Sequence, residues 1–142
     1  MKKINVVSFF SGCGGFDYGF HKNKKFNVIF ANDNWKDACE SFKLNYNKTP
    51  IIERKIEELN KSEIKKLLND KKVDVVIGGP PCQCFTRLNN NKLIKDIEGK
   101  KEDKRRKLVF EYIKKIKILQ PRIILMENVR DLVSRKNHEG KF

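Results

Sequence analysis

The stretch from Val73 to Phe85, Val-Asp-Val-Val-Ile-Gly-Gly-Pro-Pro-Cys-Gln-Cys-Phe, constrains the fold of the chain most. Its apolar part is short and β-branched, which predicts a buried strand. The glycines let the backbone turn without a steric penalty, and the prolines stiffen the exit from the strand. Cys82 therefore follows the end of a strand, where ligands of open α/β sheets bind. Taken alone, such a cysteine is more often a buried packing thiol.

Alternating strand and helix patterns occupy much of the remaining chain. Short apolar runs predict strands, and apolar residues at helical spacing predict the helices between them. Asn60 and Glu63 match the capping-box pattern that starts a helix. We expect strands over residues 4–10, 27–31, 49–52, 73–77 and 122–126, and helices beginning at residue 16 and spanning 35–46, 61–69 and 108–119. This alternation predicts a mostly parallel α/β sheet with helices on both faces.

The charge of the chain indicates a polyanionic partner. Its 142 residues, a length typical of one domain, include 32 lysines and arginines against 18 aspartates and glutamates, a formal net charge of +14. A surplus of this size favours nucleic acid as the partner. Many of the lysines stand among asparagines and isoleucines, however, so a genome poor in G and C is an alternative explanation.

The cysteines and the first residues bear on the compartment. The four cysteines make no dense disulfide framework, and the apolar run after the basic start is too short for a signal peptide or a membrane segment. We therefore expect a protein of the reducing cytoplasm without membrane contact. Neither His21 nor His138 has metal-site spacing to Cys82 and Cys84, so we expect no metal site.

A glycine loop follows the first expected strand. Gly12-x-Gly14-Gly15 predicts a ligand at the next helix N-terminus, where backbone N–H groups are free. The full Gly-x-Gly-x-x-Gly spacing of NAD sites is missing, since position 17 is Asp, and this disfavours an NAD-dependent dehydrogenase. Asp33 lies about twenty positions further on, where a carboxylate accepts the ribose hydroxyls of an adenosine-type cofactor. The pattern predicts a nucleoside cofactor without identifying it.

Three signatures together resemble those of the cytosine-C5 DNA methyltransferases. They are Phe10-x-Gly12-x-Gly14-Gly15, Gly79-Pro80-Pro81-Cys82-Gln83 and Glu127-Asn128-Val129, and the likeness runs from Ile4 to about Leu132. The resemblance implies a Rossmann-like S-adenosylmethionine-dependent methyltransferase fold, S-adenosyl-L-methionine as cofactor and double-stranded DNA as substrate. It also implies the activity of a DNA (cytosine-5)-methyltransferase, as found in DNA methylation by restriction-modification systems.

The resemblance assigns the catalytic roles to Cys82 and Glu127. Cys82 would add to C6 of a cytosine flipped out of the duplex, which makes C5 enamine-like and able to accept a methyl group. Glu127 would contact N3 and the exocyclic amine and stabilise this adduct. The implied cofactor-binding residues are Phe10 against the adenine, Gly12 and Gly14 along the amino-acid part, Asp33 on the ribose, and Leu108.

The base pocket is implied to contain four further residues, with Asn128 holding the Cys82 loop by hydrogen bonding: Pro80, Pro81, Gln83 and Asn128. Some residues keep two interpretations. Phe10 could equally be a core aromatic, Glu127 a solvated acid, and Trp35 either a packing residue or a cover for the cofactor. The remaining cysteines are interpreted as small apolar fillers: Cys13, Cys39 and Cys84.

The chain also departs from the family pattern. Lys55 stands where the family usually has an aspartate that accepts a hydrogen bond from the adenine amine, which a cation cannot do. Adenine binding is therefore expected to be weaker, or to use Glu53 or the backbone. Residues 85–88, Phe-Thr-Arg-Leu, replace the usual Phe-Ser-x-Ala-Gly run.

Length is the largest departure. We expect residues 1–142 to form a single partial catalytic domain, with a cofactor loop at 9–20, a nucleophile loop at 78–88 and Glu-Asn-Val at 127–129. The Gln-x-Arg-x-Arg segment, the target-recognition domain and the closing helix of the family are absent, so the fold is expected to be C-terminally incomplete with an exposed sheet edge. The chain is then a subunit of a split enzyme completed by a second polypeptide, a truncated form, or a non-catalytic basic remnant that binds nucleic acid or cofactor.

Overall fold

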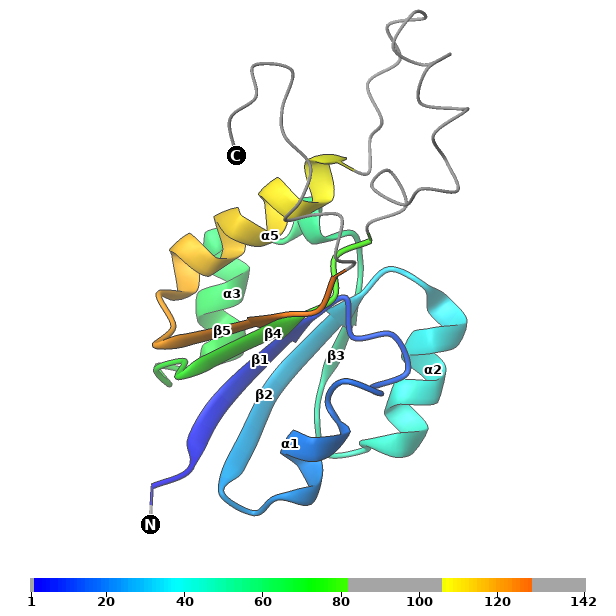
Figure 1. Cartoon of the computed structure of the whole chain (residues 1–142), viewed down its shortest axis with the longest axis vertical. Helices are drawn as coiled ribbons and strands as arrows, with labels where there is room; N and C mark the ends of the chain where they lie inside the picture. The colour runs from blue at the N-terminus through cyan, green and yellow to red at the C-terminus, as the bar shows by residue number, and fades with distance from the viewer. Residues whose placement is uncertain (1, 82–105, 129–142) are drawn as a thin grey trace, which may run out of the picture.

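The computed structural model describes residues 2–81 and 106–128, which form one parallel sheet with helices around it (Figure 1). The five strands lie in the order β3-β2-β1-β4-β5, and every pair is parallel. The strands are β1 (Ile4–Phe9), β2 (Phe26–Asp33), β3 (Ile51–Glu53), β4 (Val75–Gly78) and β5 (Ile123–Met126). The helices are α1 (Tyr18–Lys22), α2 (Lys36–Asn45), the 3-10 helix η1 (Ile56–Glu58), α3 (Lys61–Leu68) and α5 (Arg106–Leu119). This arrangement confirms the predicted Rossmann-like fold.

The helices cover both faces of the sheet, α3 and α5 on one side and α1 and α2 on the other (Figure 1). Side chains of neighbouring strand positions point to opposite faces, so β1 contributes to two apolar clusters. The larger cluster lies under α3 and α5 and includes Val7, Phe9, Ile64 and Tyr112. The smaller cluster consists of Val6, Val28, Val75 and Ile77, with Phe20 and Phe26 packed against it.

The structure differs from the predicted elements mainly at their ends. β2 continues to Asp33, past the predicted end at residue 31, because Asn32 and Asp33 pair with β3. α1 begins at Tyr18 and not at residue 16, after the glycine loop. The 3-10 helix η1 was not predicted; it buries Ile56. The predicted capping box of α3 is confirmed, because the Asn60 side chain accepts from the Glu63 backbone and the Glu63 side chain accepts from the Asn60 backbone.

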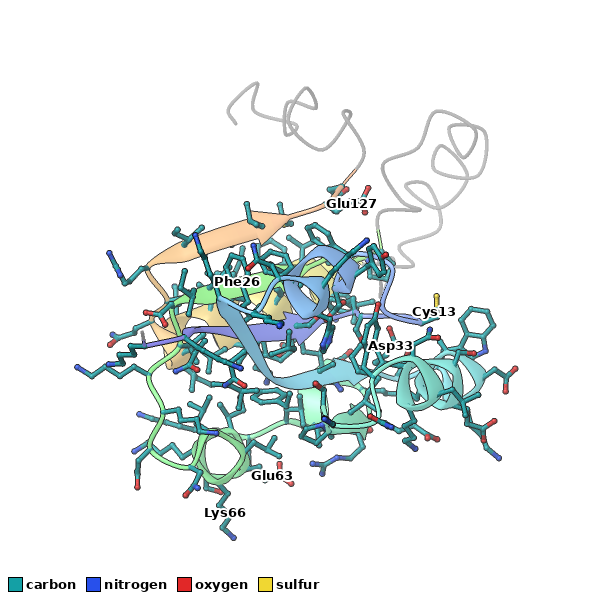
Figure 2. The ribbon with its side chains drawn as sticks, turned by 90° about the horizontal axis from the view of Figure 1, so that it is seen from below. Cys13, Phe26, Asp33, Glu63, Lys66 and Glu127 are labelled. Carbon is teal, nitrogen blue, oxygen red and sulfur yellow. The ribbon has the colours of Figure 1, made fainter. Side chains whose placement is uncertain are left out.

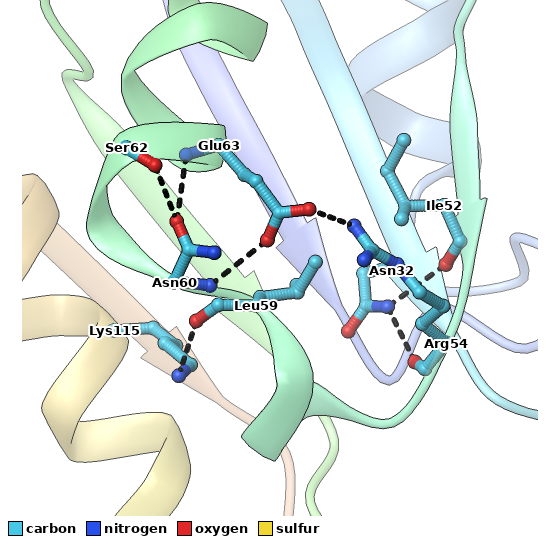
Figure 3. A network of polar contacts seen from close by, with 8 residues as sticks. All are labelled: Asn32, Ile52, Arg54, Leu59, Asn60, Ser62, Glu63 and Lys115. Atoms are coloured by element: carbon cyan, nitrogen blue, oxygen red, sulfur yellow. Dashed lines mark hydrogen bonds and ion pairs between the residues drawn. The ribbon is translucent and has the colours of Figure 1, made fainter.

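A polar network joins the sheet to α3 and α5 (Figure 3). The buried Asn32 amide donates to the carbonyls of Ile52 and Arg54, at 2.8 Å each. Arg54 in turn forms a 2.8 Å ion pair with Glu63 of the capping box. These bonds satisfy carbonyls at the end of β3 and thereby fix the chain just before Lys55.

Candidate active site

The glycine loop after β1 has an unusual backbone. Phe10, Gly12 and Gly14 have φ values of 53°, 54° and 91°. Glycine adopts such angles without penalty, but a bulky residue with positive φ is rare and strained. Strain of this kind is concentrated at functional sites, where the surrounding structure imposes it. The strained position is the residue that the sequence pattern singled out for an aromatic contact to the cofactor, Phe10.

Asp33 connects this loop to the end of β2. Its Oδ2 accepts a 2.8 Å hydrogen bond from the Gly12 backbone, and its Oδ1 accepts a 2.9 Å bond from the Trp35 backbone. Figure 2 shows Asp33 beside the loop that carries Cys13. A carboxylate has about four lone-pair positions, so two bonds leave room for further donors such as a pair of hydroxyls. The structure therefore gives Asp33 a role in shaping the loop that sequence reasoning did not anticipate.

The end of α2 holds the loop from its other side. The Tyr46 hydroxyl donates to the Gly14 carbonyl at 2.9 Å, and the Asn45 amide donates to the Cys13 carbonyl at 3.0 Å. The His21 ring stacks on the Tyr46 ring, with centroids 3.8 Å apart and planes 12° apart. The sequence pattern identified Tyr46 only as an apolar position of a helix, and nothing in that pattern pointed to its hydroxyl.

Phe10 lies between the loop and the larger apolar cluster. Its ring is half-buried and meets the Tyr112 ring edge-on, with centroids 6.3 Å apart. Leu108 is also half-buried and packs against the same cluster. Phe10 is therefore partly a core aromatic, and the part that remains accessible lies at the carboxyl edge of the sheet. Sequence reasoning did not identify Tyr112, whose buried ring supports Phe10.

The ends of β4 and β5 come together near the predicted nucleophile. The Glu127 backbone donates to the Gly78 carbonyl at 3.0 Å, and a methyl group placed on Gly79 would lie 3.3 Å from Glu127 Oε2. The Asn128 amide donates to the carbonyl of the buried Pro80 at 3.1 Å. Figure 2 shows Glu127 beyond the end of β5. Pro81 is half-buried, whereas Cys82, Gln83 and Cys84 lie outside the described residues.

Other sequence interpretations are settled by exposure. Trp35 is 65% exposed, so it is not a packing residue. Cys39 is buried as predicted, and burial raises the pKa of its thiol to about 11, with a smaller contribution from Asp33. Cys13 is exposed, so its interpretation as an apolar filler was wrong. Lys55 is exposed and follows β3, on the same edge of the sheet as Asp33.

Asp17 is a buried acid that neither the fold nor the predicted site explains. It is fully buried before α1, and neither carboxylate oxygen has a hydrogen-bond partner among the described residues. Burial raises its pKa from 3.8 to about 6, and the Ser8 hydroxyl and the Asp17 backbone partly oppose this rise without completing a hydrogen bond to the carboxylate. The Asp17 backbone carbonyl accepts from the His21 backbone, which places Asp17 directly beneath the glycine loop.

Because the folded state binds this proton more tightly than the unfolded state, Asp17 should lower stability as pH rises from about 4 to about 6. Asp17→Asn removes the buried charge. Above pH 6 the variant should be more stable than the wild type by about 2–3 kcal/mol, and the difference should shrink toward pH 4. Urea unfolding at pH 4.5, 6 and 7.5 measures this difference. The matched control is the exposed Asp70→Asn, and equal pH dependence of both variants would contradict the buried-acid explanation.

Comparison with known proteins places this geometry in a family. The family model for C-5 cytosine-specific DNA methylases matches residues 4–141. The chain belongs to this family. Type II methyltransferase M.FnuDI of Fusobacterium nucleatum is 35% identical over 137 residues, which cover 96% of this chain and 36% of that protein. M.MthTI of Methanothermobacter thermautotrophicus is 40% identical over 134 residues, which cover 93% of this chain and 36% of that protein.

Solved structures of the family share the fold. A prophage-encoded protein of E. coli described as a DNA modification methyltransferase has a TM-score of 0.74 at 29% identity, over 92% of this chain and 33% of that chain. Spodoptera frugiperda DNMT2 has a TM-score of 0.61 at 28% identity, over 94% of this chain and 38% of that chain. The chain thus spans about a third of these proteins. Within residues 2–81 and 106–128, no helix is long and apolar enough to cross a membrane.

Proposed function

We propose that the chain is the N-terminal catalytic part of a DNA (cytosine-5)-methyltransferase of the type II modification class. The observation that carries this proposal is the contact between the ends of β4 and β5. There Glu127 lies against Gly79 and Asn128 bonds to Pro80, immediately before Cys82. A strand-end acid beside the mount of a cysteine supplies the acid and the nucleophile that addition to a cytosine ring requires.

The described residues fit S-adenosyl-L-methionine, the cofactor that C5 DNA methyltransferases use in general. No atom lies within 4 Å of the position where a Cβ would stand on Gly12, so the cofactor's amino-acid part has space to approach the backbone. Asp33 has lone pairs left for the ribose hydroxyls, and the accessible part of the Phe10 ring offers a surface to the adenine. Lys55 offers no acceptor to the adenine amine. When bound, the cofactor supplies the methyl group as an electrophilic sulfonium.

The chain's own residues would activate the base. Cys82 as thiolate forms a bond to C6 of a flipped cytosine, and the ring electrons make C5 nucleophilic toward the methyl group. Glu127 binds N3 and the exocyclic amine, so negative charge does not build up unopposed on the ring. Loss of the C5 proton and elimination of the Cys82 thiolate then restore the aromatic ring. Pro80, Pro81, Gln83 and Asn128 hold the loop and shape the base pocket.

The remainder of the enzyme would come from a second polypeptide. The proposed missing parts are the target-recognition domain, the rest of the base pocket and the closing helix, and the partner substrate is double-stranded DNA in the cytoplasm. The net charge of +14 suits phosphate contacts, which raise affinity without reading sequence. The second candidate is a non-catalytic remnant that binds nucleic acid or cofactor, and the cation at Lys55 favours it because this cation removes an adenine contact.

Complementation tests the proposal directly. The chain is mixed with a second polypeptide, the part of M.MthTI that follows its matched region, and transfer of labelled methyl groups to cytosine in unmethylated duplex DNA is measured. We expect transfer from the mixture and none from either polypeptide alone. Cofactor affinity of the chain is measured in parallel by calorimetry. Asp33→Asn should weaken it by about tenfold, the effect of losing about 1.4 kcal/mol, while the exposed Asp37→Asn leaves it unchanged.

The remnant hypothesis predicts a different set of results. The chain would bind DNA with a steep dependence on salt, because phosphate contacts release counterions. It would show neither methyl transfer in the mixture nor a difference between Asp33→Asn and Asp37→Asn. That combination would reject the catalytic proposal in favour of the remnant.

A further inference from the structure

Large apolar side chains are exposed together on α5 and β5. Phe110 and Ile113 of α5 are 64% and 39% exposed. All four residues of β5, from Ile123 to Met126, are between 41% and 54% exposed. We call this surface the α5–β5 patch, and its residues are Phe110, Ile113, Ile123, Ile124, Leu125 and Met126. Contiguous exposed apolar surface of this kind marks an interaction site in a folded protein.

The patch includes an unprotected sheet edge. β5 pairs with β4 on its inner side, and its outer edge has no partner strand within the described part of the chain. Natural edge strands are short, charged, bulged or interrupted by proline, which prevents unwanted pairing. β5 is Ile-Ile-Leu-Met and has none of these charges or prolines. The opposite edge, β3, is shorter and ends at Glu53, which lies 3.8 Å from Lys43.

The exposure extends around both faces of β5. Ile124 is paired in register with Val76, and Leu125 with Ile77. Val76 and Ile77 are fully buried on opposite faces of the sheet, whereas Ile124 and Leu125 are 48% and 41% exposed. The cover that helices give to β4 therefore does not reach β5. A partner that buries the patch must add a strand to the edge and apolar side chains to both faces.

The charges around the patch favour a different polypeptide over a second copy. Lys114 and Lys117 of α5 are exposed at helical spacing from Phe110 and Ile113, and exposed Arg122 precedes β5. Two copies would bring these cations together, and the whole chain carries a net charge of +14. Like charges across an interface disfavour association. The suitable partner has an apolar centre, a strand to donate and an acidic rim.

We propose that the α5–β5 patch is the docking surface for the polypeptide that supplies the rest of the methyltransferase. This inference rests on the split form of the proposed function. In M.FnuDI and M.MthTI the region matched by this chain is 36% of the protein, so most of each protein lies outside the matched region. A strand of the partner pairs with the outer edge of β5, and its apolar residues cover Phe110 and Ile113 on one side and Leu125 on the other.

Association is measured separately from catalysis. The chain is mixed with the parts of M.MthTI and of M.FnuDI that follow their matched regions, and complex formation is followed by sedimentation. Hydrogen exchange is measured on the β5 amides, which a new strand would protect. Phe110→Lys, Ile124→Lys and the double variant change only exposed side chains, so the chain should still fold. The matched control is Leu44→Lys, because Leu44 is 86% exposed on α2, outside the patch.

We expect a one-to-one complex, protection of β5 only in the complex, and a loss of affinity of at least about tenfold for the double variant, with the control within about twofold. Complex formation without methyl transfer supports the docking surface and counts against the catalytic proposal. Methyl transfer that survives in the double variant overturns the docking surface alone. The proposal is also overturned by no complex with either partner, by β5 amides already protected in the isolated chain, or by a homodimer that the double variant disrupts.

Discussion

Replacing Cys82 with serine should abolish methyl transfer in the complemented enzyme, by at least about 10³-fold, while cofactor affinity stays the same. A thiol is partly ionised near neutral pH and its thiolate is highly nucleophilic, whereas a serine hydroxyl without a dedicated base is neither. The variant keeps nearly the same side-chain volume. The loss should therefore appear in the rate of transfer, and calorimetry with S-adenosyl-L-methionine should give the wild-type affinity.

A covalent trap identifies the attacking atom. In DNA with 5-fluorocytosine, fluorine replaces the C5 proton whose loss allows elimination, so the sulfur–C6 bond should persist after transfer. Mass spectrometry of the digested protein should find the nucleotide on the peptide of Cys82 and none on Cys13. Glu127→Gln keeps the shape but removes the acid, and it should reduce adduct formation without changing which cysteine reacts. An adduct on any other cysteine would contradict the assignment of Cys82.

The order of strands and helices was predictable because local patterns determine it. Short β-branched runs, helical apolar spacing and the capping box at Asn60 all depend on neighbouring residues. What depends on distant residues was missed. The end of β2 continues to Asp33 because Asn32 bonds to carbonyls of β3, twenty or more positions away. Propensity alone places asparagine and aspartate in a turn.

The candidate site shows the same division between local and distant information. Phe10, Gly12 and Asp33 were identified from motif spacing, and the structure places them around one loop. Tyr46 and Tyr112 were not identified, because their roles depend on contacts with a loop and a ring far along the chain. Asp17 occupies a motif position, but its burial without a partner cannot be read from spacing. The roles of Cys82 and Gln83 stay predictions, because these residues lie outside the described part.

Gly14→Ala should destabilise the chain by about 2–5 kcal/mol, the sum of about 1–2 for a left-handed non-glycine residue and about 1–3 for overpacking. At φ 91° the added methyl group would overlap Tyr46 Cε2 and lie 2.9 Å from Tyr46 Cδ2 and 3.0 Å from Phe42 Cδ2. The Tyr46 ring cannot move aside easily. It is stacked on His21, packed on Phe42 with centroids 4.9 Å apart, and bonded through its hydroxyl to the Gly14 carbonyl.

The loop should therefore shift in place of the ring, and cofactor affinity should fall together with stability. Urea unfolding and calorimetry measure the two effects. Gly19→Ala is the matched control: it lies in α1 with no atom within 4 Å of the added methyl group, so helix propensity should stabilise it by up to about 1 kcal/mol. Tyr46→Leu removes the obstructing ring. The Gly14→Ala, Tyr46→Leu double variant should be more stable than the sum of the single losses predicts, by more than about 1 kcal/mol. Strict additivity would show that backbone strain alone, and not the Tyr46 ring, requires glycine at this position.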